Sequence, residues 1–250
     1  MKRIALILLL SCVALTACLP SNTLRVMTYN VHNCIGMDGT LSCERIAQVI
    51  TNENVEVVAL QELDSMTMRI PNQDILKNIA DLTGMHPTFG ASIDYRGGKY
   101  GIGVLTREKP ISWKRIPLPC RSEPRSLLIV ELEDYYFCST HLSLHAEDRV
   151  TSAAIIAKEL GKLNKPVIIA GDFNAEPNEE SITRLSDDIC FASSPTKFTY
   201  PADKPEIEID YIGIYNKNES KHKVIEAYVV DAPIESDHRP LVSELKFKKQ

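Results

Sequence analysis

Apolar and polar residues alternate along several short segments of the chain, and this alternation predicts β-strands. Residues 24–30 alternate in this way, whereas residues 55–60 and 166–170 are short apolar runs that are typical of strands buried on both faces. Further strands are predicted at residues 100–106, 127–133, 135–140, 208–214, 223–230 and 241–247.

Three other segments carry apolar residues at helical spacing. The first begins after Ser42, a residue type that caps helix N-termini, and runs to about Glu53. The second covers residues 73–82 and precedes Gly84, which is a typical helix stop. The third and longest covers residues 146–163. The inward faces are expected to carry Ile46, Val49 and Ile50 in the first helix and Val150, Ala153, Ala154, Ala157 and Leu160 in the third.

The mixture of many strands, few helices and tight turns favours a layered domain. Turn residues occupy positions 95–99, and Glu133-Asp134 separates two strand patterns as in a hairpin. The sequence contains neither an internal repeat nor a linker. We therefore expect an α/β or α+β domain of mixed sheets with helices outside, rather than a doubly wound parallel fold.

The first residues of the chain do not fit this domain. Met1-Lys2-Arg3 is positively charged, and residues 4–15 form an apolar run too short to span a bilayer. The following Leu15-Thr16-Ala17-Cys18 resembles a bacterial lipoprotein signal. This resemblance implies a signal peptide at 1–17, lipid attached at Cys18, a tether at 18–23 and one domain at 24–250. The protein would be exported and anchored to a membrane of the bacterial cell envelope; plain secretion with an unmodified Cys18 is the alternative.

Composition and charge limit the partners. The chain has 250 residues, 44% hydrophobic and 24% charged, which excludes disorder, collagen and coiled coil. Its formal charge of −5 would become −7 on loss of Lys2 and Arg3 with the signal peptide. This negative net charge argues against a protein whose whole surface contacts nucleic acid, because such proteins are usually basic. Basic residues that form one cationic rim, or else lie on two faces, are Arg96, Lys99, Arg107, Lys109, Lys114, Arg115, Arg121 and Arg125.

Beyond Cys18 the chain has five cysteines and no C-x-x-C pair, which argues against a zinc site. Cys34 and Cys43 flank a short glycine-containing loop. They are either a disulfide or two unpaired buried thiols.

Distinctive polar residues gather where the predicted strands end. These residues are Asn30, Gln61-Glu62, His141 and the segment 171–174 (Gly-Asp-Phe-Asn). In addition, Asp210 lies within a predicted strand, and the segment 236–240 (Ser-Asp-His-Arg-Pro) precedes the last one. Singly, each has an ordinary structural interpretation, such as a turn cap or a buried histidine. Together they supply carboxylates and amides suited to Mg²⁺ or Mn²⁺, and two histidines suited to proton transfer or to binding a charged oxygen. This set predicts metal-assisted phosphoryl transfer.

Other hydrolase and nucleotide motifs do not occur. The sequence has no G-x-S-x-G, no G-x-x-x-x-G-K-[ST] and no H-E-x-x-H. Gly101 and Gly103 lack the third glycine of a dinucleotide loop and are interpreted as strand glycines.

In their order along the chain, the polar residues resemble the endonuclease/exonuclease/phosphatase superfamily. The resemblance covers residues 24–247 and is most specific at G-D-F-N and S-D-H-R-P. It implies a four-layer α/β sandwich like that of pancreatic-type deoxyribonucleases, with two mixed sheets face to face, helices on the outer faces and the site at one edge. The whole chain resembles most the bacterial metal-dependent hydrolases of this superfamily.

The resemblance also implies roles for individual residues. Glu62 would be the principal ligand of Mg²⁺ or Mn²⁺, assisted by Asn30 and Asp237. Asp172 and Asn174 would position the attacking water and the phosphate. His141 would donate a hydrogen bond to a phosphate oxygen. His238 would be the general base or a second phosphate ligand, and Asp210 would orient it. In the alternative assignment, Asp172 is the general base.

Three further positions follow from the same resemblance. Tyr100 and Arg125 match positions that contact the phosphate, although strand packing and a surface charge are equally good interpretations. Some nucleases of the superfamily carry an aspartate where this chain has His32. That difference puts a second carboxylate ligand in doubt and leaves His32 either as a ligand or as a loop residue without a role.

We expect a phosphodiesterase or phosphatase that acts by in-line water attack on a small or lipid-borne phosphate ester. Export, tethering and acidity favour such a substrate over DNA or RNA, for which a Mg²⁺-dependent nuclease is the alternative. A binding lipoprotein without turnover, and a metal-independent hydrolase that uses His141 or His238, are the other hypotheses.

Overall fold

The fold is described from a computed structural model of the chain, for residues 23–192, 194, 196, 198–216 and 223–246. The predicted signal peptide and Cys18 lie outside the described residues, as does the end of the last predicted strand. None of the helices in the described part is both long and apolar enough to cross a membrane.

Within the described residues, twelve strands form two six-stranded sheets, which we call the first and second sheet. The first has the order β11-β12-β1-β2-β4-β3, and the second has the order β5-β6-β7-β8-β10-β9. Each sheet contains one parallel pair, β1 with β2 and β7 with β8, among antiparallel ones. The strands of the first sheet are β1 (Thr23–Asn30), β2 (Val57–Ser65), β3 (His86–Tyr95), β4 (Gly98–Thr106), β11 (Lys223–Val229) and β12 (Leu241–Lys246). Those of the second are β5 (Ser112–Leu118), β6 (Arg125–Glu131), β7 (Tyr136–His141), β8 (Val167–Asp172), β9 (Ile189–Phe191) and β10 (Asp210–Tyr215).

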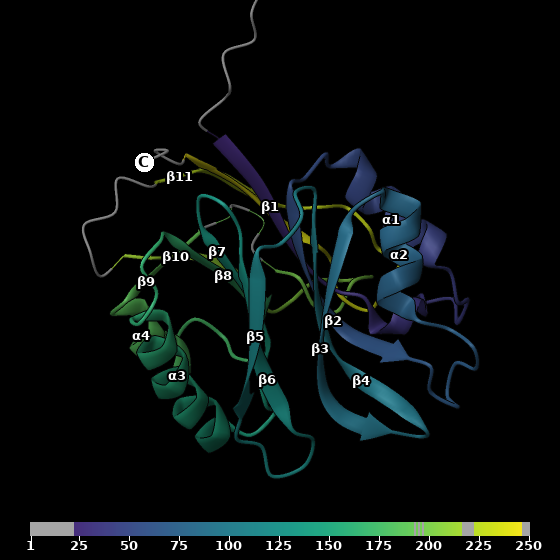
Figure 1. The fold of residues 1–250 in the computed structure, drawn as a ribbon, viewed down its shortest axis with the longest axis horizontal. Helices are drawn as coiled ribbons and strands as arrows, with labels where there is room; N and C mark the ends of the chain where they lie inside the picture. Colours follow the sequence, from purple (N-terminus) through teal and green to yellow (C-terminus); the bar gives the residue numbers. More distant parts are fainter. Residues whose placement is uncertain (1–22, 193, 195, 197, 217–222, 247–250) are drawn as a thin grey trace, which may run out of the picture.

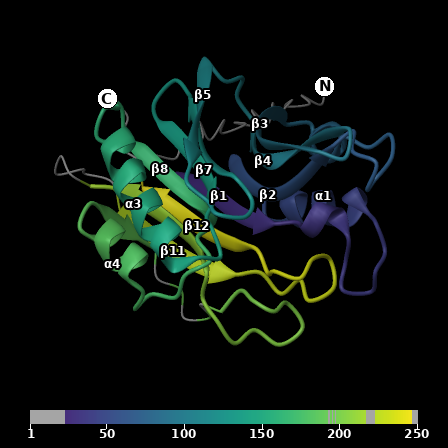
Figure 2. The same cartoon turned by 90° about the horizontal axis from the view of Figure 1, so that it is seen from below.

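Helices cover the outer faces of both sheets. Figure 1 shows α1 (Cys43–Asn52) and α2 (Ile75–Thr83) on one side of the molecule and α3 (Ala146–Leu160) and α4 (Glu180–Ser186) on the other. The view from below shows the strands between these two helical layers (Figure 2). The expected four-layer sandwich of two mixed sheets is confirmed.

Three apolar clusters fill the spaces between the four layers. Side chains alternate along each strand, so each central strand contributes to two clusters. On β2, Val57 and Ala59 enter the cluster between the sheets, whereas Val58 and Leu60 pack toward α1 and α2. The resulting burial on both faces is why the central strands are nearly continuous apolar runs.

Most predicted elements are present, with shifted ends. Ser42 caps α1 by accepting a hydrogen bond from the Arg45 backbone N at 3.4 Å, and Gly84 ends α2 with a left-handed φ of 67°. The strand predicted at 55–60 extends to Ser65, so Gln61 and Glu62 lie inside a strand and do not follow one. The predictions omitted β3, β5, β9 and α4, which are short, partly exposed or without a clear apolar period.

The longest helix differs from its prediction. It ends at Leu160, and its buried face includes Ser152, Ala153 and Ile156, whereas Ala154 is exposed. The buried face of the helix is shifted around its axis relative to the predicted face, because two charged residues in its first turns are buried. Asp148 accepts from the Ser143 hydroxyl, and Arg149 donates to the Ser143 and Leu144 carbonyls. These contacts brace the loop that follows His141.

Candidate active site

Four predicted site residues share one position in the strand pattern. On β1, β7, β8 and β10, alternate residues enter the cluster between the sheets, including Val26, Phe137, Ala170 and Ile212. Continuing the same alternation to the site end of each strand reaches Asn30, His141, Asp172 and Asp210. The strand register aligns three of them across the sheet, because His141 and Asp210 are both paired with Asp172 on the neighbouring strand β8. The polar site is therefore the edge of the core between the sheets.

Glu62 reaches this edge through a β-bulge. The pairing of β2 with β4 shifts between Leu60 and Leu63, where β2 has one residue more than its partner. Glu62 has a φ of 59°, which is uncommon for a residue with a side chain. Leu60 and Leu63 consequently both pack toward α1 and α2, and the Glu62 carboxylate accepts a hydrogen bond from Asn30 Nδ2 at 3.2 Å.

The Asp172 carboxylate is the centre of the site and is 1% exposed. Its Oδ1 accepts from the Asn174 backbone N at 2.9 Å, and its Oδ2 accepts from Asn30 Nδ2 at 3.1 Å. His141 Nε2 lies 3.4 Å and His238 Nε2 3.8 Å from the same Oδ2. Three nitrogen-bearing side chains from distant parts of the sequence therefore converge on one carboxylate oxygen.

His238 is held from its other side. Its Nδ1 lies 2.9 Å from Asp210 Oδ2, and the same oxygen accepts from the Thr199 hydroxyl at 2.6 Å. The ring of Tyr200 packs against the imidazole with ring centroids 4.8 Å apart. These contacts aim Nε2 at Asp172, as expected if Asp210 orients His238. Thr199 and Tyr200 were not identified from the sequence, because their contacts depend on how the chain folds back beside β10.

Burial and neighbouring charges separate the protonation behaviour of these groups. Burial and the negative charge of Asp210 raise the pKa of Asp172 to about 7. Burial, helped by the Arg125 and His238 charges, holds the pKa of His141 well below its usual range, so this imidazole is neutral. Burial opposes a charge on His238, but the Asp210 and Asp172 carboxylates outweigh it and raise the pKa of His238 to about 10.

Glu62, Asn30 and Asp237 are the predicted metal ligands; Asn30 joins Glu62 to Asp172 by hydrogen bonds, and Asp237 is near enough for its charge to act on Glu62. Burial raises the pKa of the Glu62 carboxyl, which the Asn30 hydrogen bond opposes and the Asp237 charge reinforces. The Ser236 hydroxyl joins the segment of Asp237 to β1 by donating to the Asn30 carbonyl at 2.7 Å. Two carboxylates near each other suit a hard divalent cation, so the donor set fits Mg²⁺ or Mn²⁺.

Asn30 and the buried Asp172–Asp210–His238 group are further candidate ligands in the part of the chain that the structure describes. Asn30 directs its amide nitrogen at both Glu62 and Asp172. To bind a metal ion through its oxygen, the side-chain amide would have to flip, so that its oxygen and nitrogen exchange places. The second group has ligand atoms within 4.8 Å of one another. Because His238 Nδ1 and Asp210 already hydrogen-bond each other, this group is arranged to hold a proton.

His32 lies next to Asn30 in the turn η1 (His32–Cys34). Its backbone N donates to Asn30 Oδ1 at 3.2 Å, and its ring Nδ1 is 3.1 Å from the Ile35 carbonyl. The residue therefore supports the turn that holds Asn30. Only Nε2 of the ring is left for a ligand, so a structural role has direct support.

Tyr100 and Arg125 are both buried near the site. Tyr100 is covered by the Arg69 guanidinium, whose carbon lies 5.2 Å from the ring centroid. Two hydrogen bonds, of 2.8 and 2.7 Å, fix Arg69 to the buried Asp64 carboxylate. Arg125 is ion-paired with Glu123, and its Nε has no hydrogen-bond partner in the described part of the chain. Tyr100 and Arg125 are therefore both buried, and Arg125 is not a surface charge. The Asp64–Arg69 pair was missed because it joins a buried carboxylate inside β2 to a polar residue in the irregular segment after the strand, without a recognisable motif.

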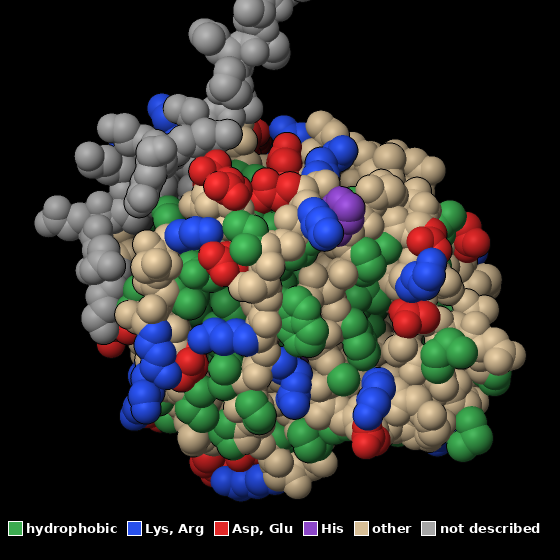
Figure 3. All heavy atoms as spheres, viewed as in Figure 1, with side chains coloured by type: hydrophobic (Ala, Val, Ile, Leu, Met, Phe, Trp, Pro, Cys, Tyr) green, Lys and Arg blue, Asp and Glu red, His purple; other side chains and the backbone are tan. Residues whose placement is uncertain are grey.

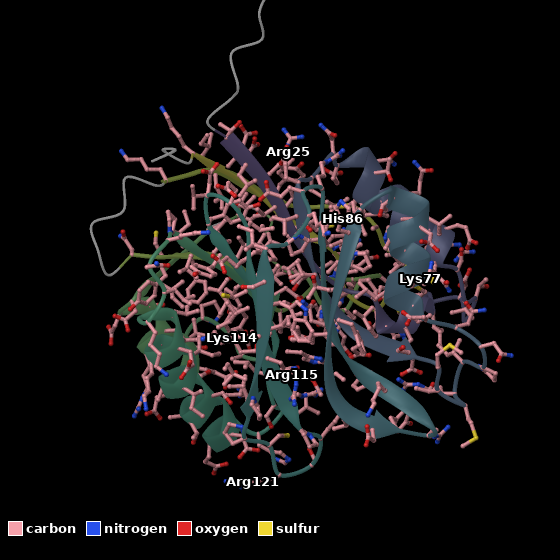
Figure 4. All side chains as sticks on the ribbon, viewed as in Figure 1. Arg25, Lys77, His86, Lys114, Arg115 and Arg121 are labelled. Atoms are coloured by element: carbon pink, nitrogen blue, oxygen red, sulfur yellow. The ribbon has the colours of Figure 1, made fainter. Side chains whose placement is uncertain are left out.

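The basic residues between 96 and 125 do not form one rim. Arg107 bonds the Val55 carbonyl at the end of the sheet opposite the site, whereas Arg121 pairs with Glu147 and Asp148 near the site end. Lys114 pairs with Glu159 of α3 at 3.6 Å. Figure 4 shows Lys114 and Arg115 along β5, with Arg121 in the loop beyond it. Blue and red side chains are interspersed over the face drawn in Figure 3.

A sequence model described as the Endonuclease/Exonuclease/phosphatase family matches residues 27–243. The chain belongs to this family. Its members are hydrolases of phosphate esters, and they generally use a divalent metal. A search of curated proteins finds no match.

Solved structures of the family share the fold. An endonuclease/exonuclease/phosphatase from Beutenbergia cavernae DSM 12333 is 24% identical, with a TM-score of 0.71 over 90% of this chain and 72% of that one. A mannosyl-6-phosphatase from Bacteroides thetaiotaomicron VPI-5482 is 19% identical, with a TM-score of 0.74 over 90% of this chain and 100% of that one. The human Nocturnin catalytic domain with a bound sulfate anion is 19% identical, with a TM-score of 0.68 over 91% and 96%. At these identities the likeness concerns the fold.

The hydrogen bond from Thr199 to Asp210 gives a testable prediction. Thr199→Val removes a donor to a buried carboxylate without changing the side-chain shape, so we expect the free energy of unfolding to fall by about 1–3 kcal/mol. Urea denaturation measures this loss. The control is Thr151→Val on the exposed face of α3, which should stay within about 0.5 kcal/mol. Equal unfolding midpoints for the two variants would contradict the buried bond.

Proposed function

We propose that this protein is a metal-dependent hydrolase of phosphate esters that acts at the cell envelope by in-line attack of water. The observation that carries the proposal is the convergence of Asn30, His141 and His238 on the Asp172 carboxylate. Donors so arranged at a buried position suit the negative charge of a phosphoryl group in its transition state. Membership of the family supplies the reaction class.

Glu62, with Asp237 and a reoriented Asn30, would hold the divalent cation. A cation there supplies Lewis-acid polarisation of a phosphoryl oxygen and neutralisation of the leaving oxygen. The bulge at Glu62 serves this role, because it presents the carboxylate at the edge of the core and away from the helix-covered face.

The remaining residues would act on the water and the phosphate. Asp172, fixed through its Oδ1 by the Asn174 backbone, orients the attacking water with its Oδ2. His141 is neutral and donates a hydrogen bond to a non-bridging phosphate oxygen. His238 is ion-paired with Asp210, which makes its Nε2–H a charged donor to a second phosphate oxygen. This arrangement supports His238 as a phosphate ligand and Asp172 as the group that accepts the proton.

The distribution of charge supports a small substrate. A long polyanion requires many lysine and arginine contacts along its backbone. Here those residues are spread over opposite ends of the sheets, and several are ion-paired. The net charge of −5 for the full chain acts in the same direction. A small phosphate ester needs only the donors described above.

If Cys18 is lipidated, the direction of β1 decides which esters can reach the site. The strand begins at Thr23 and ends at Asn30 in the site, a distance of roughly 23 Å at about 3.3 Å per residue. The chain from Cys18 to Thr23 spans at most about 18 Å when fully extended. Arg25, near the start of β1, and Arg121, in the loop near the site, lie at opposite ends of the molecule in Figure 4. Because the tether is shorter than the strand, the site would not face its own bilayer, which favours soluble esters over lipid-borne ones.

A panel of soluble phosphomonoesters and phosphodiesters, assayed with Mg²⁺ and Mn²⁺, tests the proposed reaction. We expect hydrolysis of one class, and Glu62→Gln should slow it at least about 100-fold, because the variant loses a metal ligand and with it several kcal/mol of transition-state stabilisation. Initial rates measure the effect.

The matched control is Glu226→Gln, an exposed residue of β11 that should retain full activity. Undiminished activity in excess chelator would overturn metal dependence and favour hydrolysis by the histidines alone. Cation binding with no turnover of any ester would instead identify a binding protein. Rapid cleavage of DNA with small esters left intact would identify a nuclease.

Lengthening the tether tests the orientation. A flexible Gly-Ser insertion of about 20 residues after residue 22 adds a mean reach of roughly 25 Å. On vesicles, we expect the insertion to raise hydrolysis of a phosphate ester carried by lipid in the same bilayer and to leave hydrolysis of a soluble ester unchanged. Cys18→Ser, added to the same vesicles, controls for the anchor. Equal rates on the lipid-borne ester with the native and the long tether would contradict the orientation.

A further inference from the structure

Two cysteines meet beside the site. Cys34 ends η1, and Cys43 is the first residue of α1. Their Sγ atoms are 2.8 Å apart, which is closer than unbonded sulfur atoms normally lie and longer than the roughly 2.05 Å of a disulfide. Cys34 is 1% and Cys43 8% exposed, and both pack in the cluster between the first sheet and its helices.

The backbone brings these two side chains together without any covalent link. The Ser42 backbone N donates to the Cys34 carbonyl at 2.8 Å, and Ile35 and Leu41 form an antiparallel bridge. Within this loop, Gly36 N donates to the Thr40 carbonyl at 3.0 Å. The two cysteines are therefore neighbours across the closed end of a short loop, where a disulfide requires only a small further approach of the sulfur atoms.

We propose that Cys34 and Cys43 form a disulfide bond that closes the loop at residues 34–43. The observation that carries the proposal is the contact between two buried sulfur atoms across a loop that the backbone already closes. The other cysteines of the described residues have different surroundings. Cys120 contacts the Ser143 hydroxyl, Cys138 is buried in β7, and Cys190 is exposed.

The bond would fix a turn on which the site depends. Residues 32, 33 and 34 all have positive φ, a conformation that persists only when its surroundings hold it. The His32 backbone N of this turn holds Asn30 Oδ1. The loop also reaches the segment that precedes Asp237, because Met37 N donates to the Ile234 carbonyl at 2.8 Å. A covalent link here would thus restrain both sides of the group formed by Glu62, Asn30 and Asp237.

The disulfide bond would form by two steps of thiol–disulfide exchange. One cysteine thiolate attacks a low-molecular-weight disulfide such as oxidised glutathione, which forms a mixed disulfide and releases one thiolate. The second cysteine thiolate then attacks the protein sulfur of that mixed disulfide and releases the other thiolate. The two protons lost by the cysteines are taken up by the two released thiolates. Because both sulfurs are buried in the fold, the bond forms while the chain folds and is afterwards shielded from reductants.

The experiment folds the full chain from its reduced, denatured state in a buffer of reduced and oxidised glutathione. Free thiols are then trapped by acid and alkylated under denaturing conditions, and the chain is digested for mass spectrometry. We expect one linked peptide pair containing Cys34 and Cys43, with a mass lower by two hydrogen atoms than the pair of thiols, and alkylated Cys120, Cys138 and Cys190. Either Cys34→Ser or Cys43→Ser should abolish the link, and Cys138→Ser should keep it.

A second readout separates the bond from the packing of the two side chains. After unfolding and refolding with a strong reductant, the wild-type melting temperature should be lower by about 5–10 °C than that of the oxidised protein. The same reductant should leave Cys43→Ser unchanged. Alkylation of both Cys34 and Cys43 in the glutathione buffer, or a link from either to another cysteine, would overturn the proposal. So would a reductant effect on melting that persists in Cys43→Ser.

Discussion

A carboxylate buried to 1% exposure must be compensated, and the Asp172 carboxylate imposes this requirement on the whole site. No lysine or arginine of the described residues contacts it closely. Compensation comes from the Asn174 backbone N, the Asn30 amide and two imidazoles. These donors come from four separate segments of the chain, so all four must pack correctly for the charge to be tolerated. The same donors give the site its capacity to bind another anion beside Asp172.

The sheets supply this arrangement through simple periodicity. Each strand of the core sends alternate side chains into the space between the sheets, and polar residues occupy this series at the site edge of β1, β7, β8 and β10. Register then aligns them across neighbouring strands. Glu62 departs from the pattern, because an uninterrupted β2 would have directed it toward α1 and α2. The bulge at this residue corrects its direction.

Much of this arrangement could be predicted from the sequence, because strand ends and the alternation along strands are local signals. Asn30, His141, Asp172 and Asp210 follow from them. The bulge at Glu62 could not be predicted, since it is defined by pairing with β4. Thr199 and the Asp64–Arg69 pair were also missed. The role of Thr199 arises from its contact with Asp210 on β10, whereas Asp64 and Arg69 are close in sequence but belong to no distinctive motif. The inward face of α3 was predicted only in part: Ala153 and Leu160 are buried as expected, but Ala154 is exposed. The burial of Asp148 and Arg149 depends on loop contacts that hydrophobicity does not reveal.

The central role of Asp172 can be tested by the rate of phosphate-ester hydrolysis in Asp172→Asn at saturating Mg²⁺. This change keeps the shape of the side chain and removes the charge on which the surrounding donors converge. We expect a folded protein whose rate is lower by about 100- to 10,000-fold than that of the wild type. A variant that hydrolyses the same ester within a factor of a few of the wild-type rate would contradict it.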